Sequence, residues 1–233
     1  MNLAIPDFYD FLRGPGFAVS IIIFLSVSLY RTLCLIRATR KIQKISINTE
    51  KYIHRGSIPE QGNLLRRAVE LLKIRIKNTI FGTNPVMGII SLVFHLLLFI
   101  TPVFLSAHNI IADLTIGISL PAIPEQLTDI FTLLIIALGG FFLARRLFIP
   151  RVRMISTVRD YLTLLLVMAP FLSAFIAYHH FFNYRVVIYS HMIIGEIAII
   201  IMPFTGLIHM PFIIFSRFFI DSEYSIIPGN RNW

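Results

Sequence analysis

Seven histidines occur in the 233-residue chain, and four of them form two pairs, each pair on one strongly apolar stretch. One pair is His95 and His108, and the other is His191 and His209. Ionisable side chains inside a membrane are costly and usually functional. Neutral imidazoles are metal ligands, and one imidazole on each axial position is the ligand set of a bis-histidine haem. The alternative is that these histidines only form hydrogen bonds between helices.

The elements that must position these histidines are five apolar stretches, each near the roughly 20 residues with which an α-helix crosses a bilayer. They cover about 17–36, 86–107, 127–148, 161–178 and 189–215. Hydrophobic residues make up 56% of the chain and charged residues 14%, whereas soluble domains carry about 25% charged residues. We therefore expect an all-α integral membrane protein, a single membrane domain over 1–233 with five transmembrane helices in a bundle.

The distribution of basic residues predicts how these helices are oriented. Of the 21 Lys and Arg residues, 19 fall in the segments 31–85, 145–160 and the tail 216–233, and only Arg13 and Arg185 fall on the other side. Loops rich in Lys and Arg stay in the cytoplasm. We therefore expect the N-terminus outside, the C-terminus in the cytoplasm, and the chain in the inner membrane among lipids. This asymmetry also accounts for the net charge of +9, so nucleic acid is not an expected partner.

The segment 37–85 is the one extended polar stretch, and we expect it in the cytoplasm. Within it, residues 63–80 place apolar side chains at helical spacing with basic residues between them. Such a pattern is typical of an amphipathic helix on the membrane surface. It fits a docking platform for a soluble cytoplasmic subunit equally well.

Depth in the membrane pairs the histidines across two helices. The second helix runs outward, which puts His95 near the cytoplasm and His108 at the outer surface, and the fifth helix runs inward from His191 to His209. His95 with His209, and His108 with His191, therefore match in depth, as the ligands of an inner and an outer haem b would. Positions 191 and 209 are separated by five full turns, about 27 Å, so their side chains point the same way.

The spacing on the second helix fits less well. On a straight helix, His95 and His108 point about 220° apart. A kink at Pro102 would re-aim His108, and otherwise His179 replaces it as the outer ligand.

The remaining histidines and the single cysteine are interpreted as structural: His54, His180 and Cys34. One cysteine excludes an internal disulfide, a four-cysteine zinc site and an iron–sulfur cluster bound by this chain alone. A zinc or di-iron site is disfavoured because the histidines lie at two depths. A transporter with helices broken at Pro102, Pro170 and Pro203 remains an alternative.

Several runs of the sequence resemble a known family. They are FHLLLFITPVFLSAHN (94–109), GISLPAIPEQLTD (117–129), RRLFIPRVRMISTVRDYLTLLLVMAPFLSAFIAYHH (145–180) and SHMIIGEIAIIIMPFTGLIHMP (190–211), with the opening YDFLRGPGFAVS (9–20). The chain resembles the membrane cytochrome b subunit of the Tmc redox complex of sulfate reducers. More distantly, it is similar to the gamma subunit of nitrate reductase and to membrane subunits of the Dsr and heterodisulfide reductase complexes.

The resemblance implies an electron-transfer subunit with two haem b groups, ligated by His95, His108, His191 and His209. It implies a periplasmic multihaem cytochrome c and a cytoplasmic iron–sulfur protein, similar to heterodisulfide reductase, as partners, with menaquinone as a further electron donor. On this reading the chain has no self-contained active site. A menaquinol-oxidising gamma-type anchor is the alternative within the family, and a haem-free transporter or structural component is the alternative outside it.

Two acidic residues are further candidates for a proton or quinone site. Glu196 follows His191 by about one and a half turns and could relay protons, or it is a carboxylate neutralised by a neighbouring helix. Asp113 and the loop 117–126 could cover a haem or a quinone, or form a plain surface loop. Two sets have a structural alternative as well: the arginines 145, 146, 151 and 153, which could pair with haem propionates or only anchor the inner face, and the glycines 195 and 206, which would let a haem or helix approach.

Overall fold

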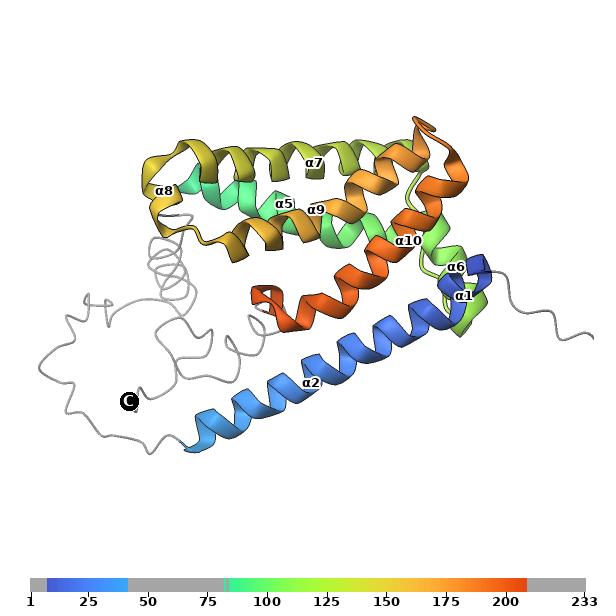
Figure 1. The fold of residues 1–233 in the computed structure, drawn as a ribbon, viewed down its shortest axis with the longest axis horizontal. Coiled ribbons are helices and arrows are strands. Elements are labelled where there is room, and N and C mark those ends of the chain that lie inside the picture. Colours follow the sequence, from blue (N-terminus) through green and yellow to red (C-terminus); the bar gives the residue numbers. More distant parts are fainter. Residues whose placement is uncertain (1–7, 42–81, 83, 209–233) are drawn as a thin grey trace, which may run out of the picture. The chain divides into compact units, whose positions relative to one another are not determined.

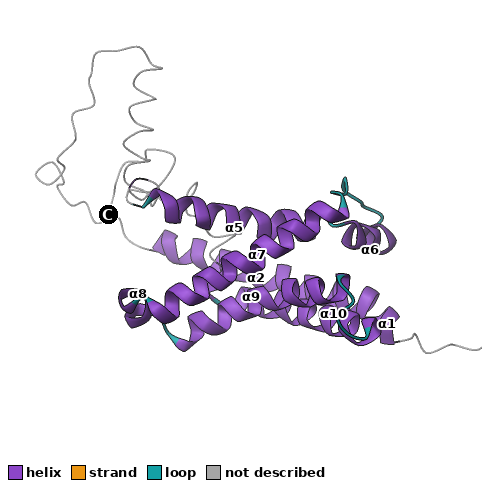
Figure 2. Ribbon diagram, turned by 90° about the horizontal axis from the view of Figure 1, so that it is seen from above, coloured by secondary structure: helices purple, strands orange, loops and turns teal. Residues whose placement is uncertain are grey.

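The computed structural model describes residues 8–41, 82 and 84–208, and most of them are helical (Figure 1). Within this part of the chain no strand occurs, and the only β pairing is an isolated bridge between Leu105 and Ile123 (Figure 2). Five helices are long and apolar enough to cross a membrane: Phe8–Arg37, Pro85–Phe104, Glu125–Phe148, Val158–Tyr178 and Tyr184–Phe204. The predicted helical class with five spans is therefore confirmed, and the chain is a multi-pass membrane protein.

The elements follow one another with short connections. They are α1 (Phe8–Phe11), the π-helical turn η1 (Leu12–Gly16), α2 (Phe17–Lys41), α5 (Pro85–Phe104), α6 (Ser106–Ile116), α7 (Glu125–Phe148), α8 (Pro150–Ile155), α9 (Val158–Tyr178), α10 (Tyr184–Ile201) and the 3-10 turns η3 (Met202–Phe204) and η4 (Gly206–Ile208). The predicted surface helix at 63–80 and the tail 216–233 lie outside the described residues.

Two predicted helix ends differ from the structure. The second span was expected to reach residue 107, but α5 ends at Phe104 and a separate helix, α6, begins at Ser106. The last span was expected over 189–215, but α10 begins at Tyr184 and its α-helical part ends at Ile201. Asn183 sets the earlier start because its side chain accepts hydrogen bonds from the backbone amides of residues 185 and 186, which is a typical N-cap.

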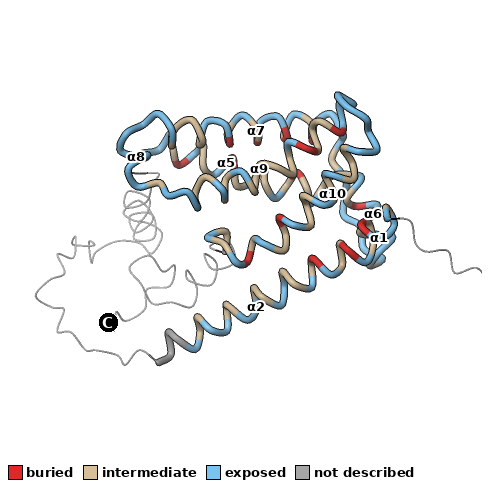
Figure 3. The backbone as a smooth tube through the Cα atoms, viewed as in Figure 1, coloured by how far each residue is buried: buried red, intermediate tan, exposed pale blue. Residues whose placement is uncertain are grey.

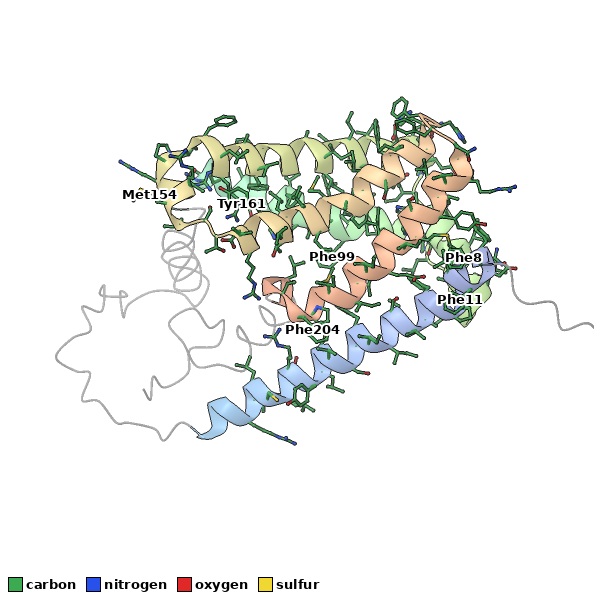
Figure 4. The ribbon with its side chains drawn as sticks, viewed as in Figure 1. Phe8, Phe11, Phe99, Met154, Tyr161 and Phe204 are labelled. Carbon is green, nitrogen blue, oxygen red and sulfur yellow. The ribbon has the colours of Figure 1, made fainter. Side chains whose placement is uncertain are left out.

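The contacts divide the chain into two compact units. Among the described residues, 8–41 and 97–208 belong to the first unit, and 84–96, which include the first part of α5, belong to the second. Within the first unit, α9 packs against both α7 and α10, and α10 packs against α2 and η1. Figure 4 shows Phe8 and Phe11 at the same end of this unit as α6, and Met154 and Tyr161 at the other end near α8.

The helices of the first unit bury small polar residues and expose large apolar ones (Figure 3). On α2, Ser20 is 1% exposed, whereas Ile22, Leu25 and Leu29 are each about 60% exposed. Lipid tails are as apolar as leucine, so exposed aliphatic side chains on a span face lipid at no cost. Close helix packing instead depends on small residues in the interface.

The interface between α7 and α9 depends on one glycine. The buried positions of α7 are Thr128, Thr132, Ile135 and Gly139, which lie on one helix face. A side chain at Gly139 would overlap the Met168 side chain of α9, whereas the neighbouring Gly140 is exposed and a Cβ there would meet nothing within 4 Å.

We expect Gly139→Leu to destabilise the folded protein by about 1–3 kcal/mol, because overpacking forces neighbouring side chains or helices to move. Gly140→Leu is the matched control and should leave stability unchanged or raise it, since leucine is a better helix former than glycine. Thermal unfolding of the two variants in the same detergent measures the difference. Equal midpoints for both variants would contradict the packing of α7 on α9 described above.

Candidate bis-histidine site

His108 and His191 come together in the first unit, although they are 83 positions apart in the sequence. Their ring centroids are 6.2 Å apart and the ring planes differ by only 12°. His108 lies on α6 and His191 on α10. These are the two residues that depth in the membrane predicts as the outer pair.

A break between α5 and α6 positions His108. Leu105 has an extended backbone (φ −70°, ψ 129°) and pairs with Ile123, so the helix stops and restarts within two residues. The predicted kink at Pro102 is therefore not what re-aims His108, because Pro102 lies inside α5 and the break follows three residues later. The calculated mismatch of about 220° does not apply, since His95 and His108 are on different helices.

The break leaves backbone carbonyls of the last turn of α5 without amide partners, and such groups must be satisfied inside a membrane. The His108 Nδ1 lies 2.8 Å from the Pro102 carbonyl oxygen. The Asn109 side-chain amide donates to the carbonyls of Val103 and Leu105, at 3.3 Å each. Its Oδ1 accepts from the backbone amide of Leu120 at 3.1 Å. Adjacent side chains, His108 and Asn109, thus complete the end of α5 and fix the start of α6.

His191 is held in a corresponding way by α9. Its Nδ1 lies 3.1 Å from the carbonyl oxygen of Pro170 and 3.0 Å from the Ser173 hydroxyl. The Ser173 hydroxyl donates to the same carbonyl at 2.9 Å, and Ser173 itself is buried. Pro170 lies inside α9, so a single helix turn contributes both groups that contact the ring.

These contacts assign the tautomer of both rings. A carbonyl oxygen only accepts, so each Nδ1 must carry the proton. In a neutral imidazole, the Nε2 then keeps its lone pair, which is the form that binds a metal. Burial lowers the pKa of His108 from its ordinary value, against a smaller opposing effect of the Pro102 carbonyl, and so favours the neutral ring. Ligating histidines in metalloproteins commonly donate their other N–H to a backbone carbonyl in this way.

The separation of the rings fits two axial ligands of one metal ion. Metal–imidazole bonds of about 2 Å on either side, with roughly 1 Å from each nitrogen to its ring centre, put the centres about 6 Å apart. A porphyrin supplies the four remaining nitrogens itself. Gly195, one helical turn after His191, leaves room for a flat group, since a Cβ there would meet nothing within 4 Å. Within the described ranges, no three His, Cys, Asp or Glu side chains converge on a common point.

The structure does not bring the predicted inner pair together. His95 lies in the second unit, and His209 lies outside the described residues, so this pair stays a prediction. The His95 Nδ1 lies 2.7 Å from the Ser91 carbonyl oxygen, which gives this ring the same tautomer as the outer pair. The expectation that one straight helix joins His191 to His209 is wrong, because the α-helix ends at Ile201 and 3-10 turns follow.

His179, the predicted alternative outer ligand, contacts a different residue. Its Nε2 lies 3.1 Å from the Asp129 carboxylate on α7, and its ring stacks on Phe181 with centroids 5.6 Å apart. The contact with Asp129 joins the end of α9 to the start of α7.

The two acidic candidates lie in contrasting surroundings. Asp113 is exposed on α6, and its backbone carbonyl accepts from the amide of Gly117, which ends the helix with a positive φ of 69°. Glu196 is half-buried on α10, and its Oε1 is buried without a hydrogen-bond partner. Among the arginines of the 145–153 group, Arg146 donates to the Ser156 hydroxyl at 3.2 Å.

The residues that sequence reasoning missed are those that hold the histidines. Asn109 and Ser173 could have been noticed, because a buried asparagine or serine next to a proline-containing helix end often bonds to free carbonyls. Leu105 and Asp129 carry no such signal. An apolar residue at the break and an acid 50 positions from its histidine are recognised only in the folded chain.

Together the fold and this site define a class: a multi-pass helical membrane protein with a pair of neutral, parallel imidazoles held between helices. The chain is 30% identical to a protein of Nitratidesulfovibrio vulgaris (strain Hildenborough), described only as "Protein", over 228 residues that cover 95% of both chains. It therefore belongs to the same family as that protein. No family model matches the chain. No solved structure matches it either.

We expect Asn109→Ala to destabilise the protein by about 1–3 kcal/mol, because it leaves buried carbonyls at the end of α5 unpaired. Thr115→Ala, which removes an exposed hydroxyl bond to Ile111 on the same helix, is the control and should cost little. The measurement is thermal unfolding in detergent. An Asn109→Ala protein as stable as the Thr115→Ala protein would contradict the role of Asn109 at the helix break.

Proposed function

We propose that this protein is a di-haem b-type cytochrome, the membrane subunit that carries electrons across the inner membrane for a larger oxidoreductase complex. The observation that carries the proposal is the His108–His191 pair, with centroids 6.2 Å apart and both Nδ1 atoms bonded to backbone carbonyls. Two histidines that merely joined helices would have no reason to present two lone-pair nitrogens to each other.

In the proposed outer site, His108 and His191 are the axial ligands. Haem b supplies reversible one-electron chemistry when bound. The protein side chains do the rest. The carbonyls of Pro102 and Pro170 orient the rings and make the Nε2 atoms better electron donors, and the apolar helices α9 and α10 exclude water. Gly195 keeps the face of α10 beside His191 free of a side chain.

The proposed inner haem has His95 and His209 as its ligands, nearer the cytoplasm. The orientation behind this assignment is the one the basic residues predict, with the N-terminus outside and the C-terminus in the cytoplasm. Two haems at two depths would form an electron path through the membrane. The tautomer of His95 supports the assignment, since its Nδ1 also bonds a backbone carbonyl.

The chain needs partners on both sides to complete this path. It has a single cysteine, so an iron–sulfur centre that accepts electrons must belong to another protein. We propose a cytoplasmic iron–sulfur subunit similar to heterodisulfide reductase, which docks on the strongly basic face that includes 37–85 and 145–153. On the outer side, a periplasmic multihaem cytochrome c or menaquinone supplies electrons. The resemblance places this electron transport in sulfate respiration.

The purified protein should show two b-type haems in a reduced-minus-oxidised spectrum, with extracted haem counted per chain. His191→Ala should lose one of them, because the outer iron then lacks an axial ligand. His180→Ala is the matched control: this residue also lies at the outer end of α9, has a backbone φ of 53°, and should keep both. A His191→Ala protein with both haems would contradict the outer site. A folded wild-type protein without haem would favour the transporter or structural alternative.

His209→Ala should remove the inner haem and leave the outer one, because only the cytoplasmic pair loses a ligand. Low-temperature spectra and redox titration distinguish the two haems if their potentials differ. Loss of the same haem in His209→Ala and His191→Ala would overturn the assignment of the ligands to two depths. A menaquinone analogue that perturbs only the outer haem would favour the menaquinol-oxidising alternative.

A further inference from the structure

Glu196 is a carboxylate in a membrane-spanning helix that none of the contacts above explains. Its Oε1 is buried and has no hydrogen-bond partner, and no ion pair to it occurs in the described part of the chain. A buried carboxylate without a partner is costly when ionised, so it needs either a proton or a function. It lies five residues after His191 on α10, about 7.5 Å further along the helix axis.

A glycine on the π-helical turn η1 makes the space for this carboxylate. A Cβ at Gly16 would lie 2.8 Å from the Glu196 Oε1 and 3.2 Å from Oε2, so any larger residue would displace the side chain. The turn η1 contacts both α10, which carries His191, and α6, which carries His108. Short π-helical turns are rare and occur frequently at functional sites. The carboxylate therefore lies between the helices of both outer histidines and a turn built to receive it.

The nearby cations of the packed elements have other partners. On η1, Arg13 pairs with Asp10 at 3.6 Å and stacks over the Tyr9 ring. On α2, Arg31 donates to the Pro203 carbonyl, the first residue before the turn at Thr205 being thereby tied to that helix, at 2.6 Å. Neither guanidinium neutralises Glu196.

The titratable groups of the other elements are also engaged or distant. On α9, Asp160 caps the cytoplasmic end of the helix by accepting from Thr157, and Tyr161 donates to the Arg146 carbonyl. On α10 itself, Tyr189 packs against the rings of Phe8 and Tyr9. His108 and His191 each bond a carbonyl through Nδ1. The charge of Glu196 thus has only the adjacent bis-histidine site to respond to.

We propose that Glu196 is a redox-linked proton-binding group, which takes up a proton when the iron held by His108 and His191 gains an electron. The inference rests on the proposed function. One electron from the donor converts iron(III) to iron(II), and one proton from water converts the Glu196 carboxylate to the carboxylic acid. Oxidation reverses both changes. The physical cause is that the added negative charge repels an unpaired carboxylate through a medium of low dielectric constant, and the proton removes this repulsion.

The half-buried position of Glu196 allows this exchange. One carboxylate oxygen is enclosed, but the residue as a whole is partly accessible and lies near η1, where Arg13 and Asp10 are exposed. Protons can therefore reach the carboxylate from the end of the unit that carries α1 and α6. A fully enclosed acid would keep one protonation state, and a fully exposed one would be screened by water.

The experiment is a redox titration of the full-length haem protein over a range of pH, made on wild type and Glu196→Gln. The haem followed is the one that His191→Ala removes. In wild type its midpoint potential should fall as pH rises, by at most about 59 mV per pH unit, the value for one proton bound per electron. Glutamine keeps the shape and cannot titrate. In Glu196→Gln the potential should be independent of pH and close to the wild-type value at low pH.

Glu125→Gln is the matched control, because it makes the same substitution at an exposed carboxylate at the start of α7. It should retain the wild-type dependence on pH, since water screens an exposed charge. Infrared difference spectra give a second readout: a carboxylic acid C=O band should appear on reduction in wild type and be missing in Glu196→Gln. A wild-type slope and band in Glu196→Gln would overturn the role of Glu196. A protein that binds no haem would instead overturn the proposed function.

Discussion

The hydrogen bond from a histidine Nδ1 to a helix carbonyl is the interaction on which the outer site depends. It fixes the tautomer, and it fixes the ring orientation because the carbonyl belongs to a rigid helix. Inside a membrane no water competes for the carbonyl, and leaving it unpaired would cost several kcal/mol. The same bond therefore completes the backbone of α5 at Pro102 and orients His108. Stability and ligand geometry are one requirement here, so neither can be lost without the other.

Prolines recur in this arrangement for a physical reason. Pro102, Pro170 and Pro203 lie in or directly after spans, and the carbonyl of each accepts from a side chain on a different element, respectively His108, His191 and Arg31. A proline within a helix removes an amide donor and bends the backbone, which opens carbonyls on that side to other donors. Polar side chains from neighbouring helices can then bind where a regular helix would offer them nothing. In a bundle whose outer surface is aliphatic, such bonds set which helices are neighbours.

Sequence alone gave the class of fold and the identity of the outer pair, but not the means by which the pair is held. Composition and block length suffice for five spans, and charge asymmetry orders His108 and His191 by depth before any contact is known. The helix break at Leu105 was beyond reach, since leucine favours helix and the cause is the pairing of its neighbours with Asn109 and Ile123. The contact between Gly16 and Glu196 was equally hidden, because it joins residues 180 positions apart. Periodicity reports local structure, and these features come from contacts between distant segments.

The polar residues inside the first unit separate into two kinds, and the difference locates function. Ser20, Thr128 and Thr132 are buried, yet each hydroxyl donates to a carbonyl of its own helix, at Gly16, Glu125 and Thr128 respectively. These residues are small groups that let helices approach, and their polarity is satisfied locally. His108 and His191 are satisfied only on one nitrogen, and Glu196 has an oxygen with no partner at all. Because an unsatisfied polar atom inside a membrane is destabilising, its persistence needs a compensating interaction with something other than protein. For the two imidazoles a metal ion provides that interaction, and for the carboxylate a proton does.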